Sequence, residues 1–443
     1  MTCEPRRDLG DGLVLRRATD ADIDTVADYN ARWLSWRGDE PDPAMRAWIH
    51  DMIGGTHPTM NAGDFTLVED ARAGEIVSSL CLIPQTWTYE GIPFGVGRVE
   101  VVSTNSGYRR RGLVRAQFDL FHAMSAERGH LVQAITGIPW FYRQFGYEYA
   151  LQLDGASTLS LSDVPSLESG ETETFVVRPA ALEDVAFLQQ VYDTGTPRSP
   201  VRCVRGEASW RYLLCGTSPE SVHHTHACVI QDAQGAPLGF LVHDSRCWGG
   251  ALTVVAMHLL PGVSWAAVAP PVLRYLQQTA AALPSTDGKP LVRLRFAFGT
   301  EHPLYGVLSS RLSAPRLAYG WYIRVADMPT FLRHIAPALE CRLAASACAA
   351  HTGDLRLGFY RSGVRIAFRG GRVQACETWS PLGSSERPHA AFPGLTFVQL
   401  LFGFRSLDDL RYAHPDCSAV DDTTAALLDV LFPRHASHVW AID

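Results

Sequence analysis

A basic turn that contains a glycine is the segment best suited to chemistry. Arg109, Arg110 and Arg111 precede Gly112, and Leu113 begins a run with helical spacing. A turn of this kind directs several backbone N–H groups and the positive end of a helix dipole at one point. A side chain in place of Gly112 would hold a ligand away from that backbone. The turn is a candidate pyrophosphate site, and the alternative is a run of solvated surface arginines.

The elements around this turn are predicted by their apolar periodicity. Residues 96–104 read as a strand that leads into the turn. Residues 113–128 place apolar side chains on one helical face, and Gly129 follows as a stop. Together they predict a strand–turn–helix unit with the basic turn at the helix start. Two further strands are predicted at residues 76–83 and 131–136, and a hairpin turn at 90–91.

Length, charge and cysteine usage bound the class of protein. A chain of 443 residues is too long for one core and suggests two to four domains. The formal net charge of −7 argues against a nucleic-acid partner, which would require a broad basic face. The N-terminus lacks the apolar core of a signal peptide, and prolines interrupt the long apolar run at 251–273. Ten scattered cysteines without a Cys-x-x-Cys pair fit reduced thiols. We expect a cytoplasmic protein with no membrane partner.

An internal repeat indicates a duplicated domain. The segment 177–185 echoes 15–23, with an arginine near its start and an aspartate six residues later in both copies. The second copy departs at the turn after its strand 252–260, where residues 261–265 read Pro-Gly-Val-Ser-Trp and contain no arginine. A phosphate site there would lack its charge, so the second copy is predicted to be structural. Between the copies, residues 152–174 read as a linker or a crossover strand.

The last part of the chain predicts a separate two-layer α+β unit. Its apolar segment 331–347 reads as two short helices parted at Pro337, and a hairpin turns at residues 370–371. Helices are expected at 396–402 and 423–431, followed by a terminal strand at 438–443. The predicted domains are therefore residues 1–155, 173–333 and 334–443.

The first domain resembles the acetyl-CoA core of the GNAT acyltransferases. The resemblance rests on the turn from Arg109 to Val114, the following helix and strand, and the segment Trp140-Phe-Tyr142-Arg-Gln-Phe-Gly-Tyr147. Val114 departs from the smaller glycine or alanine of many members. The three-part layout resembles the enhanced-intracellular-survival branch, in which a degenerate GNAT domain and a sterol-carrier-like domain follow the active one. The implied fold class is α+β, with tandem GNAT folds of mixed, mostly antiparallel sheets flanked by helices.

The resemblance implies acetyl-CoA as the co-substrate and no metal. The backbone of residues 102–104 would bind the pantetheine arm, and Gly137 and Ile138 would line the cofactor from the other side. A metal alternative, His224-x-His226-x-Cys228, lacks a clear fourth ligand. Arg109 can instead pack by its stem, so phosphate contacts are expected chiefly from Arg110, Arg111 and Arg115. The full set of implied cofactor residues is Val102, Ser103, Thr104, Arg109, Arg110, Arg111, Gly112, Leu113, Val114, Arg115, Gly137 and Ile138.

Tyr142 matches the family's general-acid position. A phenol with a pKa of about 10 can protonate a departing thiolate whose conjugate acid has a pKa near about 8.5. The alternative is a tyrosine that packs on a short helix. The base has two candidates. In the branch resembled, the terminal α-carboxylate enters the active site, which here would be that of Asp443, and the alternative is an edge strand with an exposed end. Glu100, between two valines, is the rival, and its alternative role is a buried salt bridge.

The acceptor is the least determined part. Trp33, Trp36 and Trp87 lie near carboxylates in the sequence and suit a cationic amine, although aromatic residues at such spacing also form cores. The expected function is an N-acetyltransferase acting on a small polyamine or an aminoglycoside-like amine, with a homo-oligomer as a further expectation. The alternative is a catalytically weak acyl-CoA sensor or lipid-binding protein.

Overall fold

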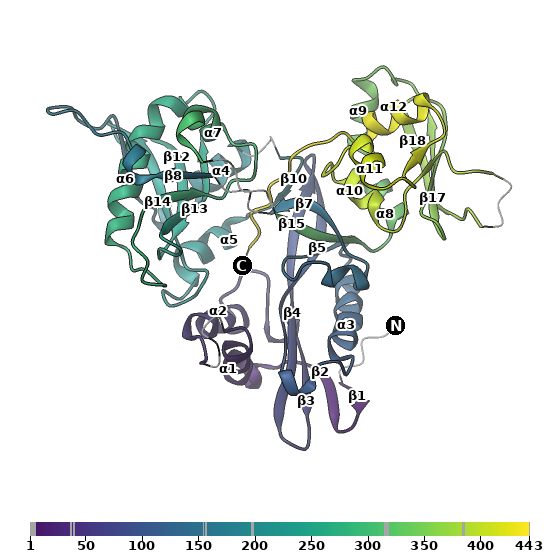
Figure 1. Ribbon diagram of the computed structural model, residues 1–443, viewed down its shortest axis with the longest axis horizontal. Coiled ribbons are helices and arrows are strands. Elements are labelled where there is room, and N and C mark those ends of the chain that lie inside the picture. Colours follow the sequence, from purple (N-terminus) through teal and green to yellow (C-terminus); the bar gives the residue numbers. More distant parts are fainter. Residues whose placement is uncertain are drawn as a thin grey trace.

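The chain is an α+β protein whose three modules are visible as three lobes (Figure 1). The computed structural model describes residues 6–35, 38, 40–153, 155, 157–195, 199–313, 319–382 and 386–442. We call the lower lobe in this view the first module, the upper left lobe the second and the upper right lobe the third. The sheets are mixed and mostly antiparallel, as the sequence predicted.

The first module is built on a nine-stranded sheet. Its two longest strands, β4 and β5, form the predicted hairpin, and Glu90 and Gly91 at its tip have φ angles of 47° and 84°. A glycine adopts such a φ without strain. The order of the sheet is β1 (Arg6–Gly10), β2 (Leu13–Arg17), β3 (Phe65–Asp70), β4 (Glu75–Tyr89), β5 (Ile92–Thr104), β6 (Val132–Ile135), β15 (Tyr319–Val325) and β7 (Glu148–Leu153), and β10 (Val201–Cys203) pairs with β4.

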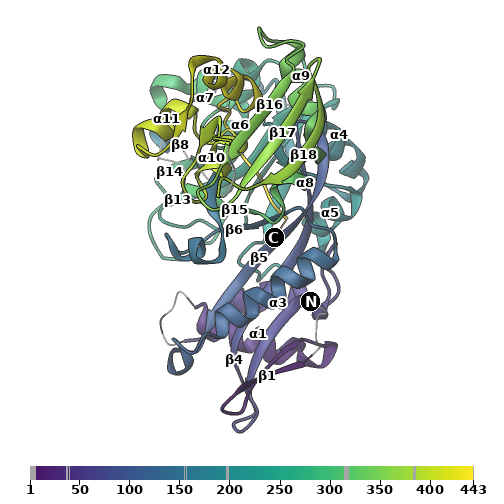
Figure 2. The ribbon, with the colours of Figure 1, turned by 90° about the vertical axis from the view of Figure 1, so that its right-hand side faces the viewer.

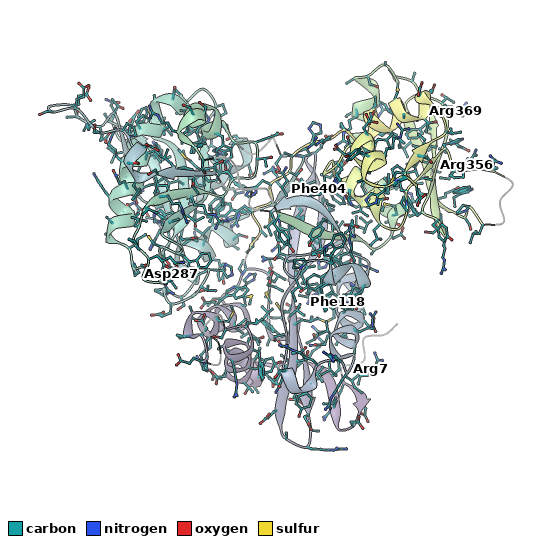
Figure 3. All side chains as sticks on the ribbon, viewed as in Figure 1. Arg7, Phe118, Asp287, Arg356, Arg369 and Phe404 are labelled. Atoms are coloured by element: carbon teal, nitrogen blue, oxygen red, sulfur yellow. The ribbon has the colours of Figure 1, made fainter. Side chains whose placement is uncertain are left out.

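Helices cover both faces of this sheet because successive side chains of a strand point to opposite faces. On β4, Leu80 and Leu82 pack against Phe118 of α3 (Leu113–Glu127), which lies on one side (Figure 3). Cys81 and Ile83 point to the other side, toward α1 (Ile23–Trp33) and α2 (Pro43–Ile53). All four β4 side chains are fully buried. The helix predicted at 113–128 is thus confirmed and fixed to the centre of the sheet.

The second module repeats this plan with a six-stranded sheet. Its β13 and β14 run parallel, as do β5 and β6 in the first module, and α6 connects them as α3 does there. The order is β8 (Ser157–Ser160), β14 (Arg293–Phe296), β13 (Ala251–Leu259), β12 (Pro237–Asp244), β11 (Thr225–Asp232) and β9 (Phe175–Pro179), with α4 (Val185–Gly195), α5 (Glu207–Arg211), the π-helix η7 (Tyr212–Gly216), α6 (Trp265–Ala282) and α7 (Pro303–Leu308).

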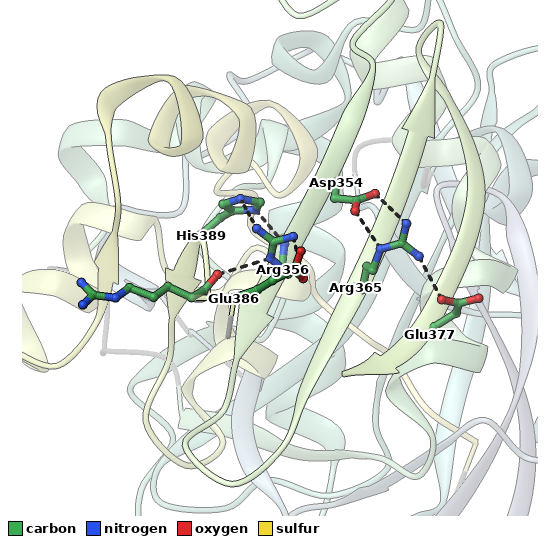
Figure 4. Close-up of polar contacts among 7 residues, drawn as sticks. Asp354, Arg356, Arg365, Glu377, Glu386 and His389 are labelled. Carbon is green, nitrogen blue, oxygen red and sulfur yellow. Dashed lines mark hydrogen bonds and ion pairs between the residues drawn. The ribbon is translucent and has the colours of Figure 1, made fainter. Parts of the chain in front are cut away.

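The third module is a five-stranded sheet covered by helices on one side (Figure 2). Ion pairs link neighbouring strands of this sheet. Arg365 of one strand contacts Asp354 and Glu377 of the strands on either side, at 2.8 and 3.0 Å (Figure 4). Arg356 contacts Glu386 at 3.1 Å and the His389 ring at 3.0 Å. Its elements are β18 (Arg372–Trp379), β17 (Gly363–Arg369), β16 (Gly353–Gly358), β19 (Ala390–Ala391), β20 (Ser418–Ala419), α8 (Met328–His334), α9 (Ala336–Ala344), α10 (Thr396–Leu401), α11 (Leu407–Ala413) and α12 (Asp422–Leu431).

Several strands cross the domain limits drawn from the sequence. β15, within the predicted second domain, lies between β6 and β7 of the first sheet. β10 pairs with β4, and β8, within the predicted linker, pairs with β14 of the second sheet. The hairpin tip of β4 and β5 also packs into the third module's core, where the Tyr89 hydroxyl donates to the Leu401 carbonyl at 2.8 Å. The three modules are therefore interlocked rather than strung on linkers.

The last described residues do not form the predicted strand. Residues 438–442 are extended, with a single β-bridge between His438 and Gln152. Side chains bind their backbone carbonyls, so a neighbouring strand is not needed to satisfy them. Within the described residues, no helix is both long and apolar enough to cross a membrane, and all nine cysteines are free thiols.

Candidate active site

A gap in the first sheet forms the centre of the site. β5 and β6 pair only from Val96↔Val132 to Arg98↔Ala134, and β5 then continues six residues further to Thr104. A bulge bends β5 at this point: Val101 has a φ of 59°, and the register with β4 shifts there. Bulges bend a strand and end its pairing on one side. The edge of residues 102–104 that faces away from β4 is thus available to a ligand backbone.

The basic turn closes this gap at the end of β5. Gly112 has a φ of 76°, a left-handed conformation in which a side chain would be strained, and it begins α3 without any capping side chain. The first N–H groups of α3, from Leu113 onward, therefore have no helical acceptor. This geometry is the one predicted from the sequence for an anion site.

The arginines of the turn surround it without neutralising partners. Arg109, Arg110, Arg111 and Arg115 are exposed, and none forms an ion pair with a carboxylate in the described part of the chain. Arg111 stacks over the Tyr108 ring at 4.9 Å. Arg115 donates to the Gln144 side chain at 3.0 Å, and Arg109 to the Thr104 carbonyl at 3.4 Å. These contacts orient the guanidinium groups and leave most of their donors for an anion.

Tyr142 packs between α3 and β15. It belongs to the short 3-10 helix η4 (Phe141–Phe145), is 4% exposed, and packs against Phe118 and Tyr322. Burial, with a smaller contribution from the negative charge of Glu100, raises the pKa of its phenol above the usual value. The phenol is therefore protonated at neutral pH, which is the form that a general acid requires.

Gly137 and Ile138 form the wall beside Tyr142. The Tyr142 hydroxyl lies 3.6 Å from the position that a Cβ on Gly137 would take, so a side chain there would contact the phenol. The carbonyls of Gly137 and Ile138 accept hydrogen bonds from Tyr319 and Tyr322 of β15. Sequence reasoning missed both tyrosines, because they arrive from a strand about 180 residues away. Ile138 is 58% exposed, and its role in lining a cofactor stays a prediction.

Glu100 and the C-terminal tail meet at Arg98. The buried Arg98 guanidinium binds the Glu100 carboxylate at 2.7 Å and the Ile442 carbonyl at 2.8 Å. Gln85 donates a second hydrogen bond to the Ile442 carbonyl at 2.7 Å. The salt bridge considered for Glu100 is present, and its side chain remains 18% exposed. Asp443 lies outside the described residues, but the residue before it is held at the site.

The second module also holds this tail. Arg205 donates to the carbonyls of Trp440 and Ala441, and its guanidinium stacks on the Trp440 ring at 3.5 Å. The Ser199 hydroxyl accepts a hydrogen bond from the backbone N–H of His438 at 3.0 Å and donates one to the His438 carbonyl at 3.4 Å. The tail thus fills the seam between two modules, where three consecutive carbonyls are bound by side chains.

A cavity of about 340 Å³ lies beside Arg98, between the first and second modules. Arg98 and Thr136 form its wall on the first module, and Thr136 directly precedes Gly137 of the Tyr142 wall. The second module contributes Tyr212, His223 and Asp244, and the tail closes another side through residues 439–442. The first module, the second module and the tail thus form the walls of one cavity.

Of the predicted substrate tryptophans, Trp33 and Trp87 do not line this cavity. Trp87 is fully buried, donates to the Gln85 side chain at 2.8 Å and packs on Trp321, so it belongs to the core. Trp33 is half-buried on α1, against Tyr29 and Arg32. Trp36 lies outside the described residues.

Among the described residues, no group of three His, Cys, Asp or Glu side chains is placed to hold a metal ion. Cys228, which the sequence offered as a metal ligand, contacts the Tyr275 hydroxyl at 3.2 Å.

Comparison with known proteins agrees with this geometry. Residues 14–150 match the acetyltransferase (GNAT) domain. A GCN5-related N-acetyltransferase from Anabaena variabilis has a similar structure, with a TM-score of 0.67 at 12% identity, covering 96% of this chain and 99% of its own. The corresponding enzyme from Kribbella flavida gives 0.65 at 18% identity, with 99% of both chains covered. Eis1 from Mycobacterium abscessus gives 0.60 at 14% identity, with coverages of 96% and 98%. No curated protein sequence matches the chain. Residues 14–150 are therefore an acetyltransferase domain of the GNAT family.

Proposed function

We propose that the chain is an acetyl-CoA-dependent N-acetyltransferase that acts on a small amine. One observation carries the proposal: an uncapped helix start with exposed arginines follows a strand that has parted from its neighbour, and a buried, protonated tyrosine packs on Phe118 of the same helix. The helix start and the arginines would bind the pyrophosphate. The backbone of residues 102–104 would bind the pantetheine arm as an added strand. This would place the thioester between β5 and Tyr142.

The reaction requires one proton to leave the amine and one to reach the sulfur. The acceptor nitrogen loses a proton to a carboxylate and attacks the thioester carbonyl, so that a C–N bond forms as the C–S bond breaks. Tyr142 donates its phenolic proton to the departing thiolate. Its raised pKa keeps the proton on the phenol until the thiolate develops beside it. Such help contributes typically about 10²–10⁴-fold in rate.

The base is one of two carboxylates, that of Glu100 or the one at the end of the tail. Glu100 is bound to Arg98 directly, and the tail that ends at Asp443 is bound to it through the Ile442 carbonyl. Two variants assign the role. If the tail supplies the base, ending the chain at Ile442 lowers kcat at least tenfold, because the carboxylate then retreats by one residue. If Glu100 is the base, Glu100→Gln has that effect and the truncation does not.

The cavity beside the thioester position suits a compact acceptor. Ligand cavities span about 300–1,000 Å³, so about 340 Å³ favours a small polyamine over a multi-ring aminoglycoside. Asp244 is the carboxylate on the second module's wall, and Arg98 and Arg205 line the same cavity. The second module, without arginines on its turn, and a sterol-carrier-like third module would serve to wall this cavity and to position the tail.

A turnover assay tests the proposed function. Free CoA is measured after acetyl-CoA is incubated with a panel of monoamines, polyamines and aminoglycosides, and mass spectrometry of the products identifies the acceptor. We expect acetylation of at least one amine, with Tyr142→Phe as the matched inactive variant. Binding of acetyl-CoA without release of CoA in the presence of any amine would instead identify a sensor.

A further inference from the structure

The second module retains a cleft at the position where the first module has its cofactor gap. β13 and β14 pair in parallel from Ala251↔Arg293 to Val254↔Phe296 and then part, as β5 and β6 do after Arg98↔Ala134. A cavity of about 720 Å³ opens between the parted strand ends, lined by residues 255–259 of β13 and by residues that follow β14. The volume lies within the range of small-molecule sites.

The chemistry of this cleft differs from that of the first module. None of the described residues that line it is an arginine or a lysine, and Glu301 contributes a carboxylate at its exposed edge. The helix start beside it is closed, because Ser264 caps α6 by accepting from the Ala267 N–H at 3.3 Å. Tyr305, on α7, donates its hydroxyl to the Phe296 carbonyl at 3.0 Å. A phosphate-bearing ligand therefore meets no arginine or lysine among the described lining residues, and the start of α6 is already capped.

Aromatic rings form much of the wall. Trp265 meets the His302 ring edge-on at 5.0 Å, and Phe298 lies 4.3 Å from the same ring. His258 lies at the back of the cleft, and burial lowers the pKa of its imidazole to about 3, so this ring is neutral. Trp440 of the tail completes the wall and also lines the smaller cavity. Aromatic rings around a cavity stack on flat ligands and attract cations to their faces.

We propose that this cleft is a second small-molecule site, for a flat aromatic ligand that is uncharged or positively charged. The parted strands supply the space, the rings supply stacking surfaces, and Glu301 selects against anions because the described lining residues include no arginine or lysine. Because Trp440 borders the cleft, a bound ligand would contact the tail two residues before the carbonyl that Arg98 and Gln85 hold.

Three probes of one shape and different charge test the proposal: benzamidine, benzamide and benzoate. Binding is measured by ligand-observed NMR titration on the full chain without acetyl-CoA, so the result does not depend on turnover. We expect benzamidine and benzamide to bind and benzoate to bind at least tenfold more weakly. Absence of binding by the first two, or equal binding of benzoate, overturns the proposal.

Gly306 provides the blocking variant. It lines this cleft and not the smaller cavity, and a Cβ built on it meets no atom within 4 Å. Gly306→Trp should therefore fill the cleft and weaken benzamidine at least tenfold, whereas Gly306→Ala should leave it unchanged. Unchanged binding by Gly306→Trp would place the probe elsewhere and overturn the proposal. Glu301→Gln tests the charge without filling the cleft: benzamidine should weaken about threefold and benzamide should not, and equal effects on both would remove Glu301 from the site.

Discussion

The same ion pair joins β2 to the segment before α1 in the first module and β9 to the segment before α4 in the second. Arg16 binds Asp22 through two hydrogen bonds of 2.8 and 2.6 Å, and Arg178 binds Asp184 through two of 2.7 and 2.8 Å. The modules differ at the turn before the long helix. In the first, Gly112 leaves α3 uncapped among arginines, and in the second, Ser264 caps α6. The scaffold has thus been kept in both copies, while the groups able to bind an anion occur on one.

The largest expected effect breaks the comparison at the basic turn. Arg111→Glu places a negative charge where we propose the pyrophosphate binds. Charge-assisted hydrogen bonds contribute about 1.5–3 kcal/mol, so we expect the affinity for acetyl-CoA to fall on the order of 100-fold. Arg111 is exposed, so the melting temperature should hardly change. Calorimetric titration measures the affinity. Ser264→Ala in the second module is the control and should leave the affinity unchanged, and an unaltered affinity in Arg111→Glu would contradict the proposed phosphate site.

The next comparison is between Tyr142, which follows β6 in the first module, and Tyr305, which follows β14 in the second. Tyr142→Phe should lower kcat by about 100-fold and leave the KM for acetyl-CoA nearly unchanged, because the phenol acts only as the thiolate departs. Tyr305→Phe in the second module should leave kcat unaltered, since its hydroxyl is bound to strand backbone. Steady-state kinetics separate the two. Similar losses in both variants would argue for a packing role of Tyr142.

A smaller effect concerns the tail, where the second module acts on the first module's site. Arg205→Met removes the donors that hold the Trp440 and Ala441 carbonyls. If the tail supplies the base, we expect kcat to fall about tenfold while the affinity for acetyl-CoA stays constant. The kcat with the amine acceptor and the affinity for acetyl-CoA are measured on the same preparation. An equal loss of acetyl-CoA affinity would mean that Arg205 supports the fold rather than the tail.

The smallest expected effect concerns the stability that the ion pair shared by the two modules contributes. The hydrogen bond from Arg16 lowers the pKa of Asp22 to about 2, and that from Arg178 lowers the pKa of Asp184. A carboxyl whose pKa is depressed in the fold stabilises the protein at pH values above its ordinary, unfolded-state pKa. This stability is lost as the pH falls through the folded-state pKa. Asp22→Asn and Asp184→Asn should each lower the free energy of unfolding by on the order of 1 kcal/mol at pH 7. In each variant this free energy should also fall less steeply than in the wild type as the pH is lowered toward 2. Urea denaturation at several pH values measures this, and a cost in one module only would show that the ion pairs are not equivalent.

The sequence predicted the parts of the site that are local in the chain. Gly112 and the arginines lie within one turn, and the apolar periodicity of the following helix is set by its own residues, so local sequence is enough to predict both. The hairpin tip at Glu90 and Gly91 was predicted for the same reason, because a tight turn between two strands needs residues that adopt a positive φ.

Contacts between distant segments could not be predicted in this way. Arg98 and Ile442 are separated by 344 residues, and nothing in either local sequence indicates the other. The insertion of β15 between β6 and β7 follows only from strand pairing. The apolar tail looked like a strand because apolar alternation does not distinguish a strand from an extended segment held by side chains. Trp87 looked available to an acceptor because sequence proximity to carboxylates carries no information on burial.

The structure of the complex with acetyl-CoA tests the central claim most directly. We predict that the pyrophosphate lies within hydrogen-bonding distance of the backbone N–H groups that begin α3 and of Arg111, with the thioester sulfur within reach of the Tyr142 hydroxyl. A pyrophosphate bound away from the turn at Gly112, or a sulfur remote from Tyr142, would contradict the account.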